Sequence, residues 1–217
     1  PSVDYIMDWK QQGISAADLQ AKVFTALRWI IDGLLPEGAC LLAGKPKSKK
    51  SWLALAVAVA VAMTGKALSY YDVLGGDVLY LDLESNQRRM KSRLNALIGS
   101  SRWPNNLHIF TEWPRGHEGI AMLDAWMTTH PSTVLIVIDI LQNFRPIRDP
   151  KGNPYDQDYE AVKMINEFAE KHRIAILIIH HTRKAKADDV FDEISGTTGL
   201  SGGVASMWVL GRSPDNS

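Results

Sequence analysis

Hydrophobic residues along this chain fall into short continuous runs, separated by stretches with helical spacing. The runs near residues 77, 134 and 174 are almost wholly apolar rather than alternating, which is typical of parallel strands buried on both faces. Between them, apolar side chains recur three or four positions apart, as in amphipathic helices. This order predicts an α/β fold with a mostly parallel sheet sandwiched by helices.

The expected strands span residues 39–43, 77–83, 107–111, 134–138, 174–179 and 207–210, and the expected helices span residues 51–64, 86–98, 119–130 and 159–172. Residues 1–35 are expected to form a short N-terminal arm, in which Ser15 caps a short helix. Residues 36–217 would form the core. Two loops rich in Gly, Pro and charged residues, 145–158 and 184–203, are expected on the surface.

Composition narrows the class of protein. Lys and Arg together number 24, as do Asp and Glu, so net charge gives no general reason to coat nucleic acid or a membrane. The single cysteine, Cys40, excludes an internal disulfide and suits a reducing cytoplasm. No signal peptide is visible, and the apolar run 53–63 is shorter than the roughly 20 residues that cross a bilayer. We therefore expect a cytoplasmic protein without a membrane partner.

The segment between the first expected strand and the first expected core helix has the pattern of a phosphate-binding P-loop. Backbone N–H groups of such a loop and of the helix start face the phosphates, Lys50 would reach the β and γ phosphates, and the Ser51 hydroxyl would bind Mg²⁺. The pattern asks for glycine before the lysine, where this chain has Lys49. The predicted nucleotide-binding residues are Gly44, Lys45, Pro46, Lys47, Ser48, Lys49, Lys50, Ser51 and Trp52.

Carboxylates follow two of the expected strands. Asp139 ends an apolar strand, the Walker B arrangement, and would hold Mg²⁺ opposite Ser51. Glu84 follows the strand at 77 and would either orient an attacking water or cap the helix that starts near residue 86. Asp82 is interpreted as a partner for the P-loop.

Two adjacent histidines end the strand at 174. His180 and His181 must point to opposite faces of the sheet, so at most one can sense the γ-phosphate. The remaining histidines and Cys40 lack metal-ligand spacing, which argues against a zinc site. The Gly-rich stretch 196–203 is interpreted as either a binding loop or a simple connector.

The order of these segments resembles the RecA-like P-loop ATPase domains of the RepA replicative helicase type, within the AAA family ATPases of phages and mobile elements. The resemblance extends from about residue 14 to residue 212. The stretches that match are LLPEG at 34–38, LLAGKPK at 41–47, SWLAL at 51–55, YLDLE at 80–84, FRP at 144–146 and ISGTTGL at 194–200.

The resemblance implies a ring, often a hexamer, with ATP and Mg²⁺ between neighbouring copies and single-stranded DNA passing through the centre. It implies that Glu84 is the catalytic carboxylate, Asp139 the Walker B acid and His181 the strand-end sensor. Arg183, Lys184 or Arg212 would act on the neighbour's nucleotide, and the sequence does not choose among them. The loops 145–158 and 184–203 would touch the DNA.

Three positions depart from the resembled pattern. Lys49 replaces the P-loop glycine, Ile140 replaces the usual Thr after the Walker B acid, and Ala205 replaces the Asp before the last strand. Each is interpreted as the loss of a small or polar residue on the phosphate side. Three functions stay open: a DNA helicase or translocase driven by ATP, a P-loop scaffold or regulatory subunit with weak or no ATPase activity, and a small-metabolite kinase.

Overall fold

The core is a parallel six-stranded sheet, seen in a computed structural model that describes residues 13–182 and 198–211. The strands lie in the order β10-β3-β9-β8-β6-β7, and every neighbouring pair is parallel. This confirms the predicted α/β class. Their bounds are β3 Gly38–Gly44, β6 Asp77–Asp82, β7 Leu107–Phe110, β8 Thr133–Asp139, β9 Ala175–His181 and β10 Ser206–Val209.

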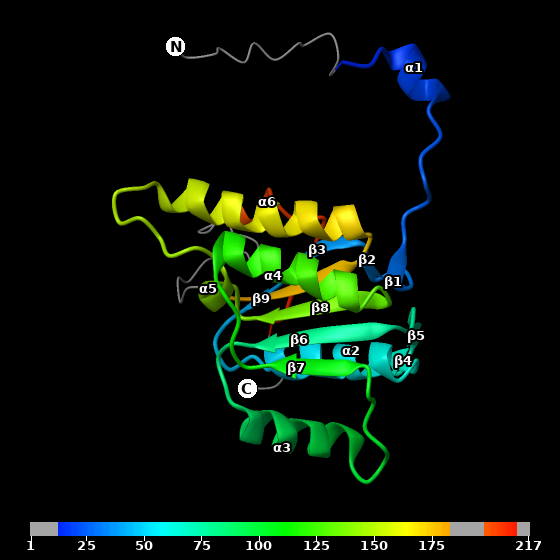
Figure 1. The fold of residues 1–217 in the computed structure, drawn as a ribbon, viewed down its shortest axis with the longest axis vertical. Coiled ribbons are helices and arrows are strands. Elements are labelled where there is room, and N and C mark those ends of the chain that lie inside the picture. The colour runs from blue at the N-terminus through cyan, green and yellow to red at the C-terminus, as the bar shows by residue number, and fades with distance from the viewer. Residues whose placement is uncertain (1–12, 183–197, 212–217) are drawn as a thin grey trace.

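Helices cover both faces of the sheet, so its central strands are buried along most of their length (Figure 1). Helices α2 (Lys50–Ala62) and α3 (Gln87–Ile98) lie on one face and share a core with Cys40 and Leu42 of β3. Helices α4 (Gly116–Thr129), α5 (Leu141–Phe144), α6 (Pro154–His172) and α8 (Thr198–Ser201) lie on the other, with Leu41 and Ala43. Because successive side chains of a strand point to opposite faces of the sheet, the apolar residues of β3 are divided between two hydrophobic cores.

The expected elements exist within a few residues of their predicted bounds, with two notable shifts. Helix α6 starts at Pro154, so residues 154–158 are helical and not part of the predicted loop 145–158. Asn153 caps this helix by accepting a hydrogen bond from the Tyr155 N–H, and proline is favoured at the first helical position. Helix α4 starts at Gly116 without a side-chain cap, which left no signal in the sequence.

Short elements outside the main sheet were not predicted. Strands β1 (Trp29–Ile31) and β2 (Leu35–Pro36) form an antiparallel pair, and so do β4 (Lys66–Ala67) and β5 (Tyr71–Asp72). Two or three residues are too few to give a pattern of alternation. None of the described helices is both long and apolar enough to cross a membrane.

Residues 13–28, ahead of β1, form an arm that leaves the core (Figure 1). Its helix α1 (Ala16–Ala21) has the predicted N-cap, because the Ser15 hydroxyl accepts a hydrogen bond from the Asp18 N–H. Arg173, at the end of α6, holds the base of the arm by donating to the Ala26 carbonyl and pairing with Glu37.

The central strands should dominate stability. Ile178 in β9 is fully buried, and replacing it by alanine should lower the free energy of unfolding by about 2–5 kcal/mol. Urea denaturation measures this loss. Ile147→Ala is the matched control, because that side chain is 81% exposed and should change stability by less than about 0.5 kcal/mol. Equal losses in the two variants would contradict this description of the core.

Candidate functional site

Four neighbouring strands bring the predicted site residues to one edge of the sheet. Because β3, β9, β8 and β6 are adjacent and parallel, their carboxyl ends lie together. The register places Gly44 beside His181 and Asp82 beside Asp139. Residues that are far apart in the sequence therefore meet at a single site.

The P-loop joins β3 to α2 and folds around the Lys50 ammonium group. Lys50 is 3% exposed, and its Nζ donates to the carbonyls of Gly44 at 2.7 Å and Lys45 at 2.8 Å and to the Ser48 hydroxyl at 3.3 Å. The Gly44 carbonyl also accepts from the Thr182 N–H, which links the loop to the end of β9. Burial lowers the pKa of Lys50, although the nearby carboxylates oppose that shift.

Lys49 occupies the position where the pattern expects glycine, and its backbone is left-handed with φ at 69°. Glycine adopts this conformation without strain, whereas other residues pay about 1–2 kcal/mol. The Lys49 side chain is exposed, so it does not fill the loop. No described side chain caps the start of α2, which leaves its N–H groups available to an anion.

The rest of the loop is open to solvent. Lys45, Pro46 and Lys47 are exposed, and Lys47 is also left-handed with φ at 65°. Trp52, in the first turn of α2, is 39% exposed. The predicted binding segment is thus a surface loop around one buried cation.

Asp139 is a buried carboxylate beside the P-loop. Burial raises its pKa from the ordinary 3.8 to about 6, hydrogen bonds from Ser51 and Tyr80 oppose the rise, and the charges of Asp82 and Glu84 add to it. The Tyr80 hydroxyl donates to Asp139 Oδ2 at 3.0 Å. The other oxygen, Oδ1, is buried and has no hydrogen-bond partner among the described residues.

These groups fit Mg²⁺ and the phosphates of a nucleotide. A buried carboxylate oxygen without a partner lies beside a serine hydroxyl, and hard oxygen ligands are what Mg²⁺ prefers. Asp82 Oδ1 is likewise buried without a partner, while Oδ2 accepts from Ser85. A bound cation would offset the repulsion between these carboxylates.

Glu84 and His181 come together across the sheet edge. Glu84 Oε2 lies 3.6 Å from His181 Nε2, and the Glu84 side chain is half exposed. Helix α3 is capped by Asn86, which accepts a hydrogen bond from the Arg89 N–H, so the capping alternative for Glu84 is wrong. A solvent-accessible carboxylate at this place has the exposure that a water-activating group requires.

His180 faces the opposite side of the sheet, as the alternation along β9 predicted. Asp158 and Arg145 of that layer lie near enough to act on its charge, and burial is the main reason that its pKa is lowered to about 4. His180 is therefore a neutral side chain of the opposite layer, and His181 is the histidine at the P-loop edge.

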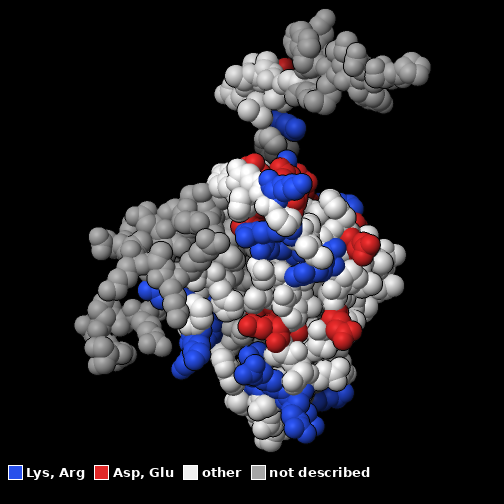
Figure 2. Space-filling view, turned by 90° about the vertical axis from the view of Figure 1, so that its left-hand side faces the viewer, with Lys and Arg blue, Asp and Glu red and all other residues white. Residues whose placement is uncertain are grey.

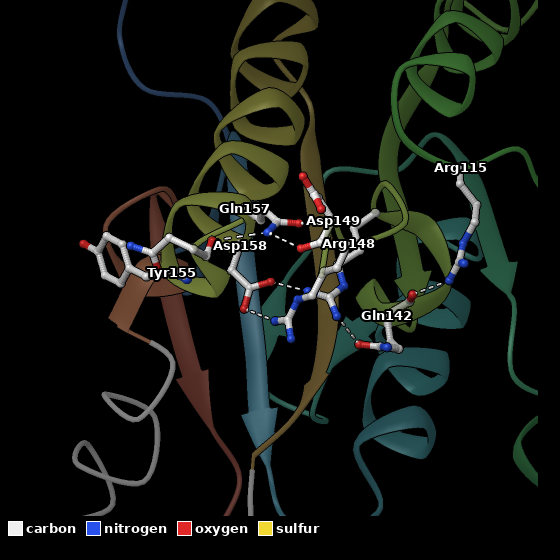
Figure 3. A network of polar contacts seen from close by, with 9 residues as sticks. Arg115, Gln142, Arg148, Asp149, Tyr155, Gln157 and Asp158 are labelled. Atoms are coloured by element: carbon white, nitrogen blue, oxygen red, sulfur yellow. Dashed lines mark hydrogen bonds and ion pairs between the residues drawn. The ribbon is translucent and has the colours of Figure 1, made fainter. Parts of the chain in front are cut away.

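A buried ionic network fixes the segment that follows Asp139. Asp158, on α6, pairs with both Arg145 and Arg148. The side chains of Asp158 and Arg145 are nearly inaccessible to solvent. Arg145 also donates to the Gln142 side chain at 2.6 Å, and Arg115 donates to the Gln142 carbonyl. Figure 3 shows Asp158 on α6 and Arg148 on the segment after α5 reaching toward one another, with Gln142 on α5 close by. The network holds α5 against α6.

Two polar positions of the site were missed in the sequence. Asn143 donates to the Leu83 carbonyl at 2.8 Å and so fixes the backbone beside Glu84, but a lone Asn in a short helix gave no signal. Tyr80 did give a signal in the sequence, because a tyrosine in a buried strand needs a hydrogen-bond partner for its hydroxyl. That partner is Asp139.

One interpretation of the sequence is wrong. Ala205 lies just ahead of β10, where its N–H donates to the carbonyl of Ala39 at the start of β3. Because the two strands are parallel, Ala205 is at the amino edge of the sheet, opposite the P-loop. Its side chain cannot affect the phosphate side. Ile140, by contrast, directly follows Asp139 and is 8% exposed within the core.

Several predicted residues lie outside the described part of the chain. These are the candidate trans-acting cations Arg183, Lys184 and Arg212. Of the Gly-rich stretch, residues 198–203 are described. They include α8, which packs on α6 and buries Leu200 in the core. This part of the stretch is therefore packed against the core.

Comparisons with known proteins agree with this geometry. The sequence profile of the family described as "AAA domain" matches residues 10–187. The chain is similar to a solved structure described as an "ATPase Domain", with a TM-score of 0.64 and 14% identity over 83% of this chain and 72% of that one. No curated protein matches the sequence. Together with the sheet order, these findings agree with an α/β fold of the RecA-like P-loop type.

The buried Asp139 should make stability depend on pH. Between pH 4 and pH 6 the folded chain binds more protons at this group than the unfolded chain, so its contribution to stability falls as pH rises. Above pH 6 the buried charge costs on the order of 3 kcal/mol. We expect Asp139→Asn to gain free energy of unfolding relative to the parent between pH 4.5 and pH 7.5.

Urea denaturation at the two pH values measures this gain. Asp32→Asn, which neutralises an exposed carboxylate, is the control and should show little pH-dependent difference. A difference for Asp139→Asn that is the same at both values would contradict the raised pKa.

Proposed function

The chain belongs to the AAA domain family. From that premise we propose that it binds ATP with Mg²⁺ and hydrolyses ATP at the γ-phosphate, as the motor domain of a ring-forming DNA helicase or translocase. One observation carries the proposal. The Lys50 ammonium, the pair of Ser51 and Asp139, and the pair of Glu84 and His181 all gather at the carboxyl edge of the sheet.

Each group has a role that its position supports. The Lys50 ammonium would leave the loop carbonyls for the β and γ phosphates, and the N–H groups at the start of α2 would bind them directly. Ser51 and Asp139 would hold Mg²⁺, which supplies charge stabilisation for the phosphoryl group. Glu84, held at its backbone by Asn143, would orient the attacking water.

His181 would sense the γ-phosphate from its place between Gly44 and Glu84. A cation from a neighbouring copy, from among Arg183, Lys184 and Arg212, would complete the charge around the transferred group. Replication or recombination of DNA is the setting in which we propose that this motor works, with single-stranded DNA in the centre of a ring that is often hexameric in the resembled group.

The alternative is a P-loop scaffold that binds nucleotide weakly, and the left-handed Lys49 favours it. The exposure of the Lys49 side chain favours the motor, because the charge lies outside the loop. The alternative of a small-metabolite kinase has no such support, because that function does not require Glu84 beside His181.

Hydrolysis should depend on Lys50. We expect ATPase activity that requires Mg²⁺, rises with single-stranded DNA and falls roughly 100-fold or more in Lys50→Ala, because the variant loses the cation that binds the phosphates. Phosphate release under saturating ATP measures it. Lys66→Ala removes an exposed lysine of β4, outside the P-loop, and should retain most activity. Absence of turnover in the assembled parent protein would contradict the motor.

Lys49→Gly separates the motor from the scaffold. If the motor is correct, the substitution relieves strain but changes nucleotide affinity by less than about threefold, because the side chain already points outward. Displacement of a fluorescent ATP analogue measures the affinity. Lys47→Gly is the control, since its backbone is equally left-handed. A rise of roughly tenfold or more in Lys49→Gly alone would favour the scaffold.

A further inference from the structure

Two buried carboxylates meet at the carboxyl ends of β6 and β8. Asp82 and Asp139 are register partners in these neighbouring parallel strands, which lie about 4.8 Å apart. Tyr80 of β6 and Val137 of β8 pack on the side of the sheet that α2 covers. Because side chains alternate along a strand, Asp82 and Asp139 point to that same side.

Neither carboxylate has a counter-ion in the described part of the chain. Each residue is 1% exposed, and Oδ1 of each has no hydrogen-bond partner among the described residues. The Lys50 ammonium group donates to the loop carbonyls of Gly44 and Lys45 instead. Buried carboxylates without a partner are rare in proteins, because losing the solvation of a charge is costly.

The exposed charges at this edge of the sheet are of a different kind. Figure 2 looks onto the edge at which the arrows of Figure 1 end, and both basic and acidic side chains appear on its surface. Water solvates charges of that kind, so they need no partner. Burial denies water to Asp82 and Asp139, and a bound cation would therefore stabilise both.

The oxygen atoms at this place suit a hard divalent cation. They come from the two carboxylates and from the Ser51 hydroxyl, which hydrogen-bonds to Asp139. Mg²⁺ and Mn²⁺ prefer oxygen ligands, and Mg²⁺ commonly takes one or two carboxylates together with water and phosphate oxygens. No three His, Cys, Asp or Glu side chains of the described residues are placed to hold a metal. The chain would therefore supply part of the shell, and water or a phosphate the rest.

We propose that Asp82 and Asp139 together hold one Mg²⁺ or Mn²⁺, and that this cation binds before the nucleotide. Both carboxylates belong to the chain, so the cation finds two ligands without ATP. The inference rests on the proposed function in one respect, that Asp139 holds the metal, and it adds Asp82 and an order of binding. Asp82 Oδ2 also accepts from the Ser85 hydroxyl. An asparagine can keep that contact, whereas ligation needs the carboxylate.

Mn²⁺ alone, titrated into the nucleotide-free chain, tests the site. The paramagnetic resonance signal of free Mn²⁺ measures binding, and the parent should take up a single ion. Asp82→Asn should weaken the affinity roughly tenfold or more. Asp77→Asn is the control, because Asp77 starts the same strand at the opposite edge, and its affinity should stay within about twofold of the parent. No binding by the parent, or equal affinity in Asp82→Asn, would overturn the proposal.

Glu84→Gln separates ligation from a general effect of charge. The Glu84 side chain is half exposed at the same edge, so its removal takes away a nearby charge that water screens. Mn²⁺ affinity should fall by less than about threefold in this variant. Equal losses in Glu84→Gln and Asp82→Asn would count against direct ligation by Asp82.

Thermal unfolding distinguishes a ligand from a structural residue. Mg²⁺ without nucleotide should raise the Tm of the parent and leave that of Asp82→Asn nearly unchanged, because only the parent binds the ion well. In cation-free buffer Asp82→Asn should unfold at no lower temperature than the parent, since it removes a buried charge. A clearly lower Tm there, or an equal rise with Mg²⁺ in both chains, would make Asp82 structural and refute the proposal.

These measurements contain no nucleotide, so their outcome is independent of the proposed function. Loss of Mn²⁺ binding in Asp82→Asn, in a chain that does not bind ATP, would keep the cation site and refute the motor. ATP binding with the same Mg²⁺ dependence in the parent and in Asp82→Asn would keep the motor and refute the cation site.

Discussion

The parallel alignment of β3, β9, β8 and β6 is the constraint on which the site depends. Four strands that run the same way deliver their carboxyl ends to one edge, so each polar residue just past an apolar run arrives in the same place. Gly44 meets His181 and Asp82 meets Asp139 by register alone. Reversing any one strand would separate the P-loop from a residue that it needs.

Buried charge is the energetic consequence of that arrangement. Lys50, Asp82 and Asp139 lie at the sheet edge with little access to water, and the pKa shifts of Lys50 and Asp139 both oppose their charged forms. Such a site lowers the stability of the fold unless a ligand supplies the missing charge. The ionic network of Arg145, Asp158 and Arg148 is different, because each charge there already has a partner.

The sequence predicted the sheet and most of the site because both follow from simple patterns. Apolar runs located the central strands, and the residues after them, Ser51, Asp139, Glu84 and His181, were found from that position. Contacts between distant residues were not accessible: Tyr80 to Asp139 and Asn143 to Leu83 depend on register and on α5. Ala205 was misplaced because a residue before a strand lies at the opposite edge from one after it.

The N-terminal arm is the part of the fold that local sequence explains least. Helix α1 has a good N-cap but none of its residues is buried, so the local sequence explains where the helix starts but not what stabilises it.

The central claim, that the P-loop binds ATP despite Lys49, is tested most directly by calorimetric titration of ATP with Mg²⁺ into the parent chain. Saturable binding of one nucleotide per chain in the micromolar range is the predicted result. No binding heat under conditions where the chain is folded would contradict it.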